Sequence, residues 1–329
     1  SPMRSVVAFC GTLAPAAIII IGQTLDRDSR LLLGWTVVAG AIAAFVPGAV
    51  QLSGANTYAL LFAERTVPDV LYGTFANRNS TALFMVIALC VLCGMPLPKN
   101  RIVLMAGAAA AVLLAIGTIL TQSRTGMALL VVPIGLFGLR LVLGFTGKSP
   151  DQRTGRAAIG VAAGLAALVA GAVIVSATTG GRAADSFARF STTMETDRPE
   201  MWEDGLYAAG QYWPMGAGMG AFDDVFQMHE SLEFVSPRRA GRAHNDYIEL
   251  AIESGLIGLV LAALWLAWCG YSTLRKGPPN SWWPRLGAGA GIAAVAMQSA
   301  LDYPLRNQTL LCVAAVLIVL LVKNRRAGV

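Results

Sequence analysis

The chain has 329 residues, of which 55% are hydrophobic and only 13% are charged. Soluble domains carry roughly 25% charged residues, so this composition argues against a soluble globular protein and for one whose solvent is the lipid bilayer. The net charge of +6 is divided between two membrane faces in the arrangement predicted below, so it gives no argument for nucleic-acid binding.

Crossing about 30 Å of hydrocarbon takes roughly 20 apolar residues in a helix. The chain offers nine candidate segments, at 6–23, 31–52, 80–97, 102–121, 126–146, 157–178, 246–273, 286–301 and 308–322. They predict an all-α polytopic membrane protein with about nine transmembrane helices. Its expected parts are six spans in residues 1–178, one large loop at 179–245, and three spans in residues 246–329.

The four lysines predict the orientation of these spans. Lys99, Lys148, Lys276 and Lys323 all fall in short connections on one side of the nine-span arrangement. Because short positive loops stay in the cytoplasm, the large loop and the segments 53–79 and 302–307 are expected to face outward. Every basic residue on that outer side is an arginine, whose planar fork suits phosphate and carboxylate groups better than lysine does.

The cysteines and histidines give little reason to expect a metal or redox centre. Cys90 and Cys93 have C-x-x-C spacing but lie inside an apolar span without polar company, which favours a packing role. Two histidines without a suitable cysteine set predict no zinc site. No cofactor is expected, although a Mg²⁺ ion held by acidic side chains stays open.

Two outer helix entrances carry polar side chains. Asn79 or Ser80 is a good N-cap for the third span, while Asn77, Arg78 and Asn79 also make a hydrogen-bonding rim, and both interpretations stay open. Arg124 stands between the fourth and fifth spans, close to hydrocarbon. A snorkelling arginine would explain it, but the outer face is where cations are disfavoured, so a ligand-binding role is preferred.

The large loop contains signals of ordered structure. Asp197-Arg198-Pro199-Glu200 is typical of a helix start. The residues that follow from Arg198 along one helical stripe are Trp202, Leu206, Ala209 and Trp213. This stripe predicts an amphipathic helix lying on the bilayer, the alternative being a surface helix whose arginine pairs with a glutamate.

Further along the loop, Gly216, Gly218 and Gly220 stand at alternate positions. No strand precedes them, so they predict a tight turn beside a substrate and not a dinucleotide-binding loop. His229 is interpreted as a surface histidine.

His244 precedes a predicted N-cap, Asn245, and the next long apolar segment. Asp246, Glu249 and Glu253 fall on one stripe of that helix, and three carboxylates near hydrocarbon need water, cations or arginines opposite them. Their own roles stay open. In the last outer connection, an internal pair of Asp302 with Arg306 and a contact with substrate explain the residues equally well.

These residue types suit glycosyl transfer from a lipid-linked diphosphate sugar. A neutral histidine can deprotonate a hydroxyl, and arginines can hold a diphosphate and stabilise its charge as it leaves. One rival is a transporter of anions or lipid-linked glycans, which would carry ionisable residues deep in several spans. Another is a lipid-phosphate hydrolase with water as the acceptor.

The motifs, taken in order, resemble the O-antigen ligase and polymerase family of bacterial inner-membrane glycosyltransferases. They are Gly73-x-Phe75-x-Asn77-Arg78-Asn79, Thr121-x-Ser123-Arg124-x-Gly126, Arg198-x-x-x-Trp202, Gly216-x-Gly218-x-Gly220-x-Phe222, His244-Asn245-x-Tyr247-x-Glu249 and Asp302-x-Pro304-x-Arg306. Each motif is weak alone, but six in order around one large loop are fairly specific.

The resemblance implies an inverting, metal-independent reaction at the periplasmic face, with a glycan on undecaprenyl diphosphate as donor. It places Arg124 and Arg198 on the diphosphate and makes His244 the base. The other expected substrate contacts are Arg78, Asn79, Arg242, Asn245, Tyr247, Glu249 and Arg306.

The acceptor can be lipid A–core, a growing glycan or a protein, and the motifs do not choose among them. Lipid A–core is preferred because ligases are frequent in the family. Relatives have about a dozen helices with both ends cytoplasmic, so three N-terminal helices are expected to be missing here.

Overall fold

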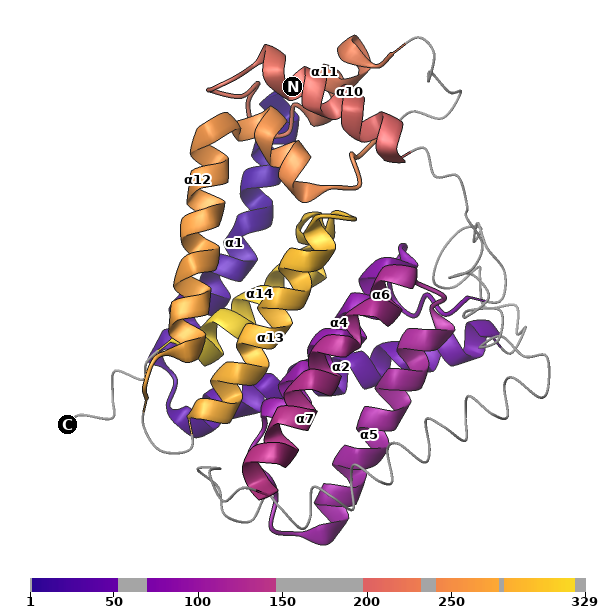
Figure 1. Cartoon of the computed structure of the whole chain (residues 1–329), viewed down its shortest axis with the longest axis vertical. Coiled ribbons are helices and arrows are strands. Elements are labelled where there is room, and N and C mark those ends of the chain that lie inside the picture. The colour runs from indigo at the N-terminus through magenta and orange to yellow at the C-terminus, as the bar shows by residue number, and fades with distance from the viewer. Residues whose placement is uncertain (1, 53–69, 146–197, 232–240, 278–280, 323–329) are drawn as a thin grey trace.

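The computed structural model describes residues 2–52, 70–145, 198–231, 241–277 and 281–322 (Figure 1). Within these ranges every regular element is a helix, which confirms the all-α prediction for the described part of the chain. The predicted span 157–178, the loop segment 179–197 with its helix-start residue Asp197, and the segment 53–69 lie outside these ranges. The division into parts at residues 178 and 245 therefore stays a prediction.

The helices follow the predicted segments closely. In order they are α1 (Pro2–Thr24), α2 (Arg27–Leu52), α4 (Arg78–Gly94), α5 (Arg101–Leu120), α6 (Arg124–Leu129), α7 (Val131–Phe145), α10 (Arg198–Gln211), α11 (Phe222–His229), α12 (Asp246–Leu274), α13 (Trp282–Ser299), the 3₁₀ turn η1 (Pro304–Arg306) and α14 (Gln308–Leu321). Among the described residues, four stretches are long and apolar enough to cross a membrane: Arg27–Leu52, Arg101–Leu120, Arg124–Gly144 and Asp246–Leu274.

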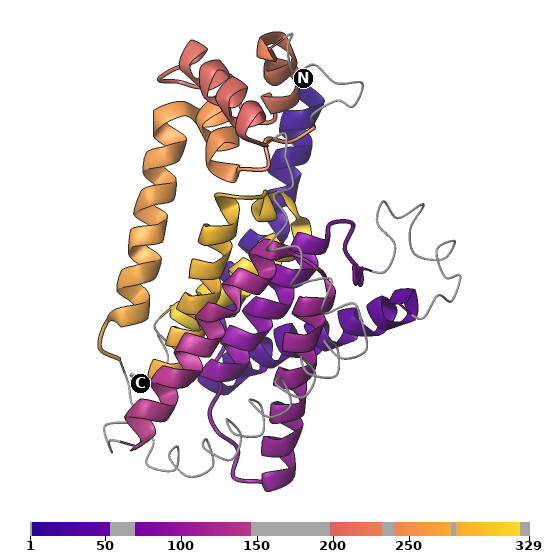
Figure 2. The same ribbon diagram turned by 45° about the vertical axis from the view of Figure 1, so that its right-hand side comes forward.

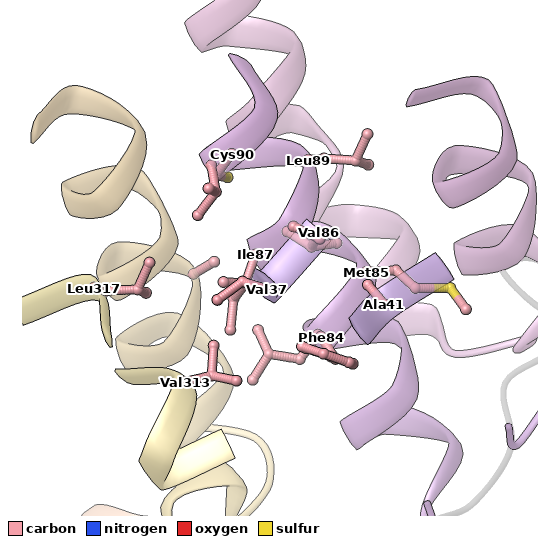
Figure 3. Close-up of a cluster of buried hydrophobic side chains, with 14 of the residues drawn as sticks. Val37, Ala41, Phe84, Met85, Val86, Ile87, Leu89, Cys90, Val313 and Leu317 are labelled. Atoms are coloured by element: carbon pink, nitrogen blue, oxygen red, sulfur yellow. The ribbon is translucent and has the colours of Figure 1, made fainter. Parts of the chain in front are cut away.

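Helix α4 is the centre of the bundle. All residues from Ser80 to Val91 are buried, and a helix that is apolar on all sides is expected to be surrounded by others. It packs against α2, α5 and α13, and side chains from α2 and α14 join the same core (Figure 3). Because α4 is fixed on every side, its N-terminal end is a rigid support for the polar groups found there.

The predicted fifth span is broken at Leu130, between α6 and α7. Pro133 follows the break, and its missing N–H cannot bond to the carbonyl of residue 129. Helix α6 is thereby a separate short helix whose first residue is Arg124. The N-cap of α4 is also corrected: Asn77 accepts a hydrogen bond from Asn79 N at 2.8 Å, so the cap is Asn77 and neither Asn79 nor Ser80.

The predicted span 246–273 is kinked at Gly255. This residue has a non-helical φ of 55°, and Leu256 N donates to Pro214 O at 2.9 Å where the helix bends. The segment from Asp246 to Ser254 therefore turns away from the long apolar part of α12, as Figures 1 and 2 show. The three carboxylates of the stripe all lie on this first segment and not along the apolar part.

Helices α10 and α11 pack on the first segment of α12 at one end of the bundle, which we call the α10 end (Figure 2). The buried face of α10 is Asp204, Gly205, Ala208 and Ala209. The predicted stripe is divided: Trp202 hydrogen-bonds within the protein and Ala209 is buried, whereas Leu206 is 60% and Trp213 51% exposed. Contact of this stripe with the bilayer stays a prediction. Small residues allow α10 to approach α12 closely, and this contact decides which side of the helix faces inward.

Arginines serve as helix caps at the opposite end of the bundle. Arg30 donates to carbonyls at the C-terminal ends of both α1 and α14, Arg275 donates to the end of α14, and Arg140 donates to the end of α4. The last carbonyls of a helix have no partner inside it, and the helix dipole favours cations there. These arginines, of which Arg30 and Arg140 are buried, therefore stabilise the fold.

Candidate functional site

Four segments that are far apart in sequence meet at the α10 end of the bundle. They are the start of α4, the start of α6, the start of α12, and the connection between α13 and α14 (Figure 1). The hydrogen bonds described next join them directly. The predicted motifs are therefore brought together in space, although up to 225 residues separate the bonded side chains in the sequence.

Asp302 is the centre of the site. It is 2% exposed, and its Oδ2 atom accepts hydrogen bonds from Asn79 Nδ2 at 2.7 Å and Asn77 Nδ2 at 3.2 Å. Its Oδ1 atom accepts from the backbone N–H of Tyr303 at 3.0 Å and lies 3.3 Å from Nδ1 of His244. Each carboxylate oxygen thus has two partners, which holds the group in one orientation.

The surroundings of Asp302 keep it ionised. Burial acts to raise the pKa of this carboxyl, but the hydrogen bonds from His244, Asn79 and Tyr303 outweigh burial and hold its pKa below the ordinary value. An ionised carboxylate can only accept hydrogen bonds, so Nδ1 of His244 carries the proton in this pair. The other ring nitrogen, Nε2, is then the one able to take up a proton.

His244 is held in an unusual backbone conformation. Its φ is 49°, in the left-handed region that non-glycine residues rarely adopt, and its ring meets that of Tyr303 edge to face at 4.9 Å. The side chain is 34% exposed, so the ring is fixed on one side and accessible on the other. Gln122, beside the start of α6, is the other non-glycine residue with positive φ in the described part of the chain. Both flank the same site, as strained residues often do.

A second chain of hydrogen bonds runs from Asp302 to the helix that carries Arg124. Asn79 accepts a hydrogen bond on Oδ1 from Ser123 Oγ at 2.7 Å, while its Nδ2 donates to Asp302. Ser123 Oγ also accepts from Gly126 N at 3.1 Å, which makes Ser123 the N-cap of α6. Arg124 is the next residue and is half-buried at the site.

Helix α10 holds together the two loop segments that carry His244 and Asp302. Arg198 Nη1 donates to the carbonyl of Leu301 at 2.7 Å, and one turn later Trp202 Nε1 donates to the carbonyl of Ala243 at 2.9 Å. Leu301 immediately precedes Asp302, and Ala243 immediately precedes His244. The Arg198-x-x-x-Trp202 spacing therefore places the arginine beside the His244–Asp302 pair.

The carboxylates of α12 do face arginines, as the stripe predicted. Arg306 donates through Nη2 to Glu253 at 2.8 Å, and its Nε lies 3.2 Å from Glu249 and 3.9 Å from Asp246. Arg242 lies 3.3 Å from Glu249. The suggested internal pair of Asp302 with Arg306 is not formed. Asp302 bonds to Asn77, Asn79 and His244, whereas Arg306 pairs with the carboxylates of α12.

The same cluster anchors the glycine-rich turn. Oε1 of Glu253 accepts from Gly220 N at 3.0 Å, and the backbone N–H groups of Ala217 and Gly218 bond to the carbonyls of Ile252 and Glu253. The turn thus packs against the kink of α12. It is a tight turn, as predicted, and the described contacts give it a structural role.

Two other predicted substrate contacts bond to the protein. Asn245 is the N-cap of α12, as predicted, and its Nδ2 donates to Ala300 O at 3.0 Å. Tyr247 donates its hydroxyl to Ala296 O at 2.8 Å. Both tie α12 to the end of α13. Arg78 is the first residue of α4 and is half-buried beside Asn79.

His229 has aromatic companions, which the sequence did not indicate. Its half-buried ring lies edge to face with Tyr207 and Tyr212, at 5.9 and 5.8 Å. These residues join α10 to α11 and are separate from the His244 site.

A cavity of about 730 Å³ adjoins the site between α1, α12, α13 and α14. Its polar end is formed by Arg242, Asp246, Glu253 and Arg306, and its inner wall includes Trp265 and Leu266. Such a combination suits an amphiphilic molecule with a hydrocarbon part. Within the described ranges, no group of three or more histidine, cysteine or acidic side chains is arranged to hold a metal ion.

Asp302, Asn77 and Ser123 are site residues that sequence reasoning did not assign to the site. All three stand in motifs that the sequence displays: Asn77 in a hydrogen-bonding rim, Ser123 before Arg124, and Asp302 in an outer connection whose role the sequence leaves open. What was missing was the contact between the segments, which no local pattern reveals.

Comparison with known families agrees with the motifs. Residues 109–263 match the family model described as O-antigen ligase, a range that contains Arg124, Arg198 and His244. The match agrees, over residues 109–263, with the resemblance predicted from the sequence. No curated protein matches the chain in sequence.

Proposed function

We propose that this protein is an inverting glycosyltransferase at the periplasmic face of the bacterial inner membrane. It would transfer a glycan from undecaprenyl diphosphate to an acceptor hydroxyl, with lipid A–core as the acceptor in an O-antigen ligase reaction. The observation that carries the proposal is the His244–Asp302 pair, held between the start of α6 with Arg124 and the start of α10 with Arg198.

His244 is the general base of the proposed reaction. With Nδ1 bound to ionised Asp302, Nε2 removes the proton from the acceptor hydroxyl. The hydroxyl oxygen attacks the anomeric carbon of the donor, and the bond from that carbon to the diphosphate oxygen breaks on the opposite face, which inverts the configuration. Asp302 stabilises the imidazolium that forms, as the carboxylate does in a catalytic triad.

Arg124 and Arg198 stabilise the leaving group. Negative charge grows on the diphosphate as the glycosidic bond breaks, and guanidinium groups placed in advance lower the energy of that transition state. Arg198 uses Nη1 to hold Leu301, but a guanidinium has five N–H donors, so the same side chain can also bind an oxyanion. Arginines acting in this way make a divalent cation unnecessary, and we propose a metal-independent reaction.

The adjoining cavity supports a lipid-linked substrate. Its polar end lies beside the site and its apolar wall continues along α12 into the part of the helix that is apolar enough to span a membrane. A hydrocarbon chain lying there would keep the reacting headgroup at the bilayer surface.

The test is transfer by purified protein with undecaprenyl-diphosphate glycan and a panel of acceptors, with EDTA throughout. The wild-type protein is expected to form a conjugate, and His244→Ala is expected to lose at least 100-fold in turnover, the scale on which general bases act. A folded His244→Ala protein with wild-type turnover would overturn the base assignment. Conjugation to a growing glycan or to protein would replace the ligase assignment, and release of free glycan would indicate a hydrolase.

A further inference from the structure

Both ends of the Asn79 side-chain amide are hydrogen-bonded within the protein. Its amide oxygen accepts from Ser123 Oγ and its amide nitrogen donates to Asp302, both at 2.7 Å. Its backbone carbonyl accepts from Gln298 Nε2 at 2.9 Å, and its backbone N–H donates to Asn77. An amide whose two ends are both used at short distance is oriented by its neighbours, which differs from the substrate contact that the motif suggested.

The sequence of bonds is continuous from one functional group to the other. It begins at the N-cap of α6, next to Arg124, passes through Asn79 to Oδ2 of Asp302, and leaves through Oδ1 to His244. Because α4 is buried on all sides, Asn79 is attached to the most rigid part of the bundle. A small displacement of Ser123 would therefore be transmitted to the orientation of the Asp302 carboxylate.

We propose that Asn79 and Ser123 are positioning residues that fix His244 through Asp302 and keep it in register with Arg124. The inference rests on the proposed function, because it assigns these residues to the same reaction. The base His244 and the leaving-group residue Arg124 are 120 residues apart in the sequence. The hydrogen bonds through Ser123, Asn79 and Asp302, which we call the relay, join their two segments into one rigid arrangement. In this proposal neither Asn79 nor Ser123 contacts the donor or the acceptor.

Asn79→Ala is the first test. We expect kcat to fall about 10- to 100-fold, the effect of losing a hydrogen bond to a buried charge, while KM for the undecaprenyl-diphosphate donor stays within about twofold. A raised donor KM with unchanged kcat would overturn the proposal and make Asn79 a substrate contact.

A double-mutant cycle separates positioning from general damage. If Asn79 acts only through Asp302, then Asn79→Ala should have little further effect in the Asp302→Asn background. An undiminished loss there would overturn the proposal. Asn100→Ala is the control, since it removes the N-cap of α5 at the opposite end of the bundle and should leave kcat unchanged.

Ser123 supplies a second, independent test. Ser123→Ala should lower kcat and Ser123→Thr should restore it, because the threonine hydroxyl can still cap α6 and donate to Asn79. Failure of threonine to restore kcat, in a protein of wild-type thermal stability, would contradict the relay. The proposed function and the relay fail differently: wild-type turnover in His244→Ala overturns the former, whereas a His244-dependent enzyme indifferent to Asn79→Ala overturns only the latter.

Discussion

At the scale of single residues, the site contains two kinds of arginine. Arg198, at the start of α10, holds the carbonyl of the residue before Asp302. Arg124, at the start of α6, follows Ser123, which is joined to Asp302 through Asn79. Arg306 instead lies among three carboxylates. Burial acts to lower its pKa, but those acids outweigh burial and hold the pKa above its ordinary value, so Arg306 is a permanent cation. The sequence predicted all three as substrate contacts because it shows the residue type but not the partner.

Arg306→Gln should destabilise the protein severely. Removing one partner of a buried ion pair leaves uncompensated charge, at a cost of about 3–5 kcal/mol. Arg242→Gln is the matched control, because Arg242 is 41% exposed and shares Glu249 with Arg306, so its loss should cost under about 1 kcal/mol. Thermal unfolding in detergent compares the two. An Arg306→Gln protein that melts like the wild type but no longer binds donor would make Arg306 a substrate residue after all.

At the scale of elements, composition predicted the helices but not their interruptions. The predicted ends of α2, α4, α5 and α14 agree with the observed helix ends within a few residues, because the length of an apolar run can be read from the local sequence. The kink in α12 depends on a contact with the turn at Pro214 and Gly216, forty residues earlier, which no window of local sequence contains. The prediction that Asp246, Glu249 and Glu253 share one helix face was correct because all three residues precede the kink at Gly255.

Gly255→Ala should therefore be strongly destabilising. The residue has φ of 55°, and an added Cβ would lie 2.0 Å from the carbonyl oxygen of Pro214, so backbone would have to move. We expect a loss of about 1–3 kcal/mol from backbone strain, with reduced transferase activity because the turn and Glu253 shift together. Gly270→Ala on the same helix is the control, since nothing lies within 4 Å of its added Cβ, and it should be neutral or slightly stabilising. Equal melting temperatures for the two variants would contradict this account of the kink.

At the scale of the whole molecule, the two ends of the bundle are chemically different. The α10 end holds the hydrogen-bonded polar site, whereas arginines at the opposite end cap the C-terminal carbonyls of α1, α4 and α14. Exposed Lys276 lies at that opposite end too, just after α12. Retention of short positive loops in the cytoplasm predicts that the opposite end faces the cytoplasm and the α10 end faces the periplasm.

Labelling of single cysteines in intact cells tests this orientation. In a variant whose five native cysteines are replaced, Tyr207→Cys on α10 should react with a membrane-impermeant maleimide, because Tyr207 is 60% exposed at the α10 end. Lys276→Cys should react only after the inner membrane is permeabilised. Both variants should retain transfer activity, since neither side chain contacts the His244–Asp302 pair in the described contacts. The reverse labelling pattern would place the site in the cytoplasm, where a donor displayed on the outer leaflet could not reach His244.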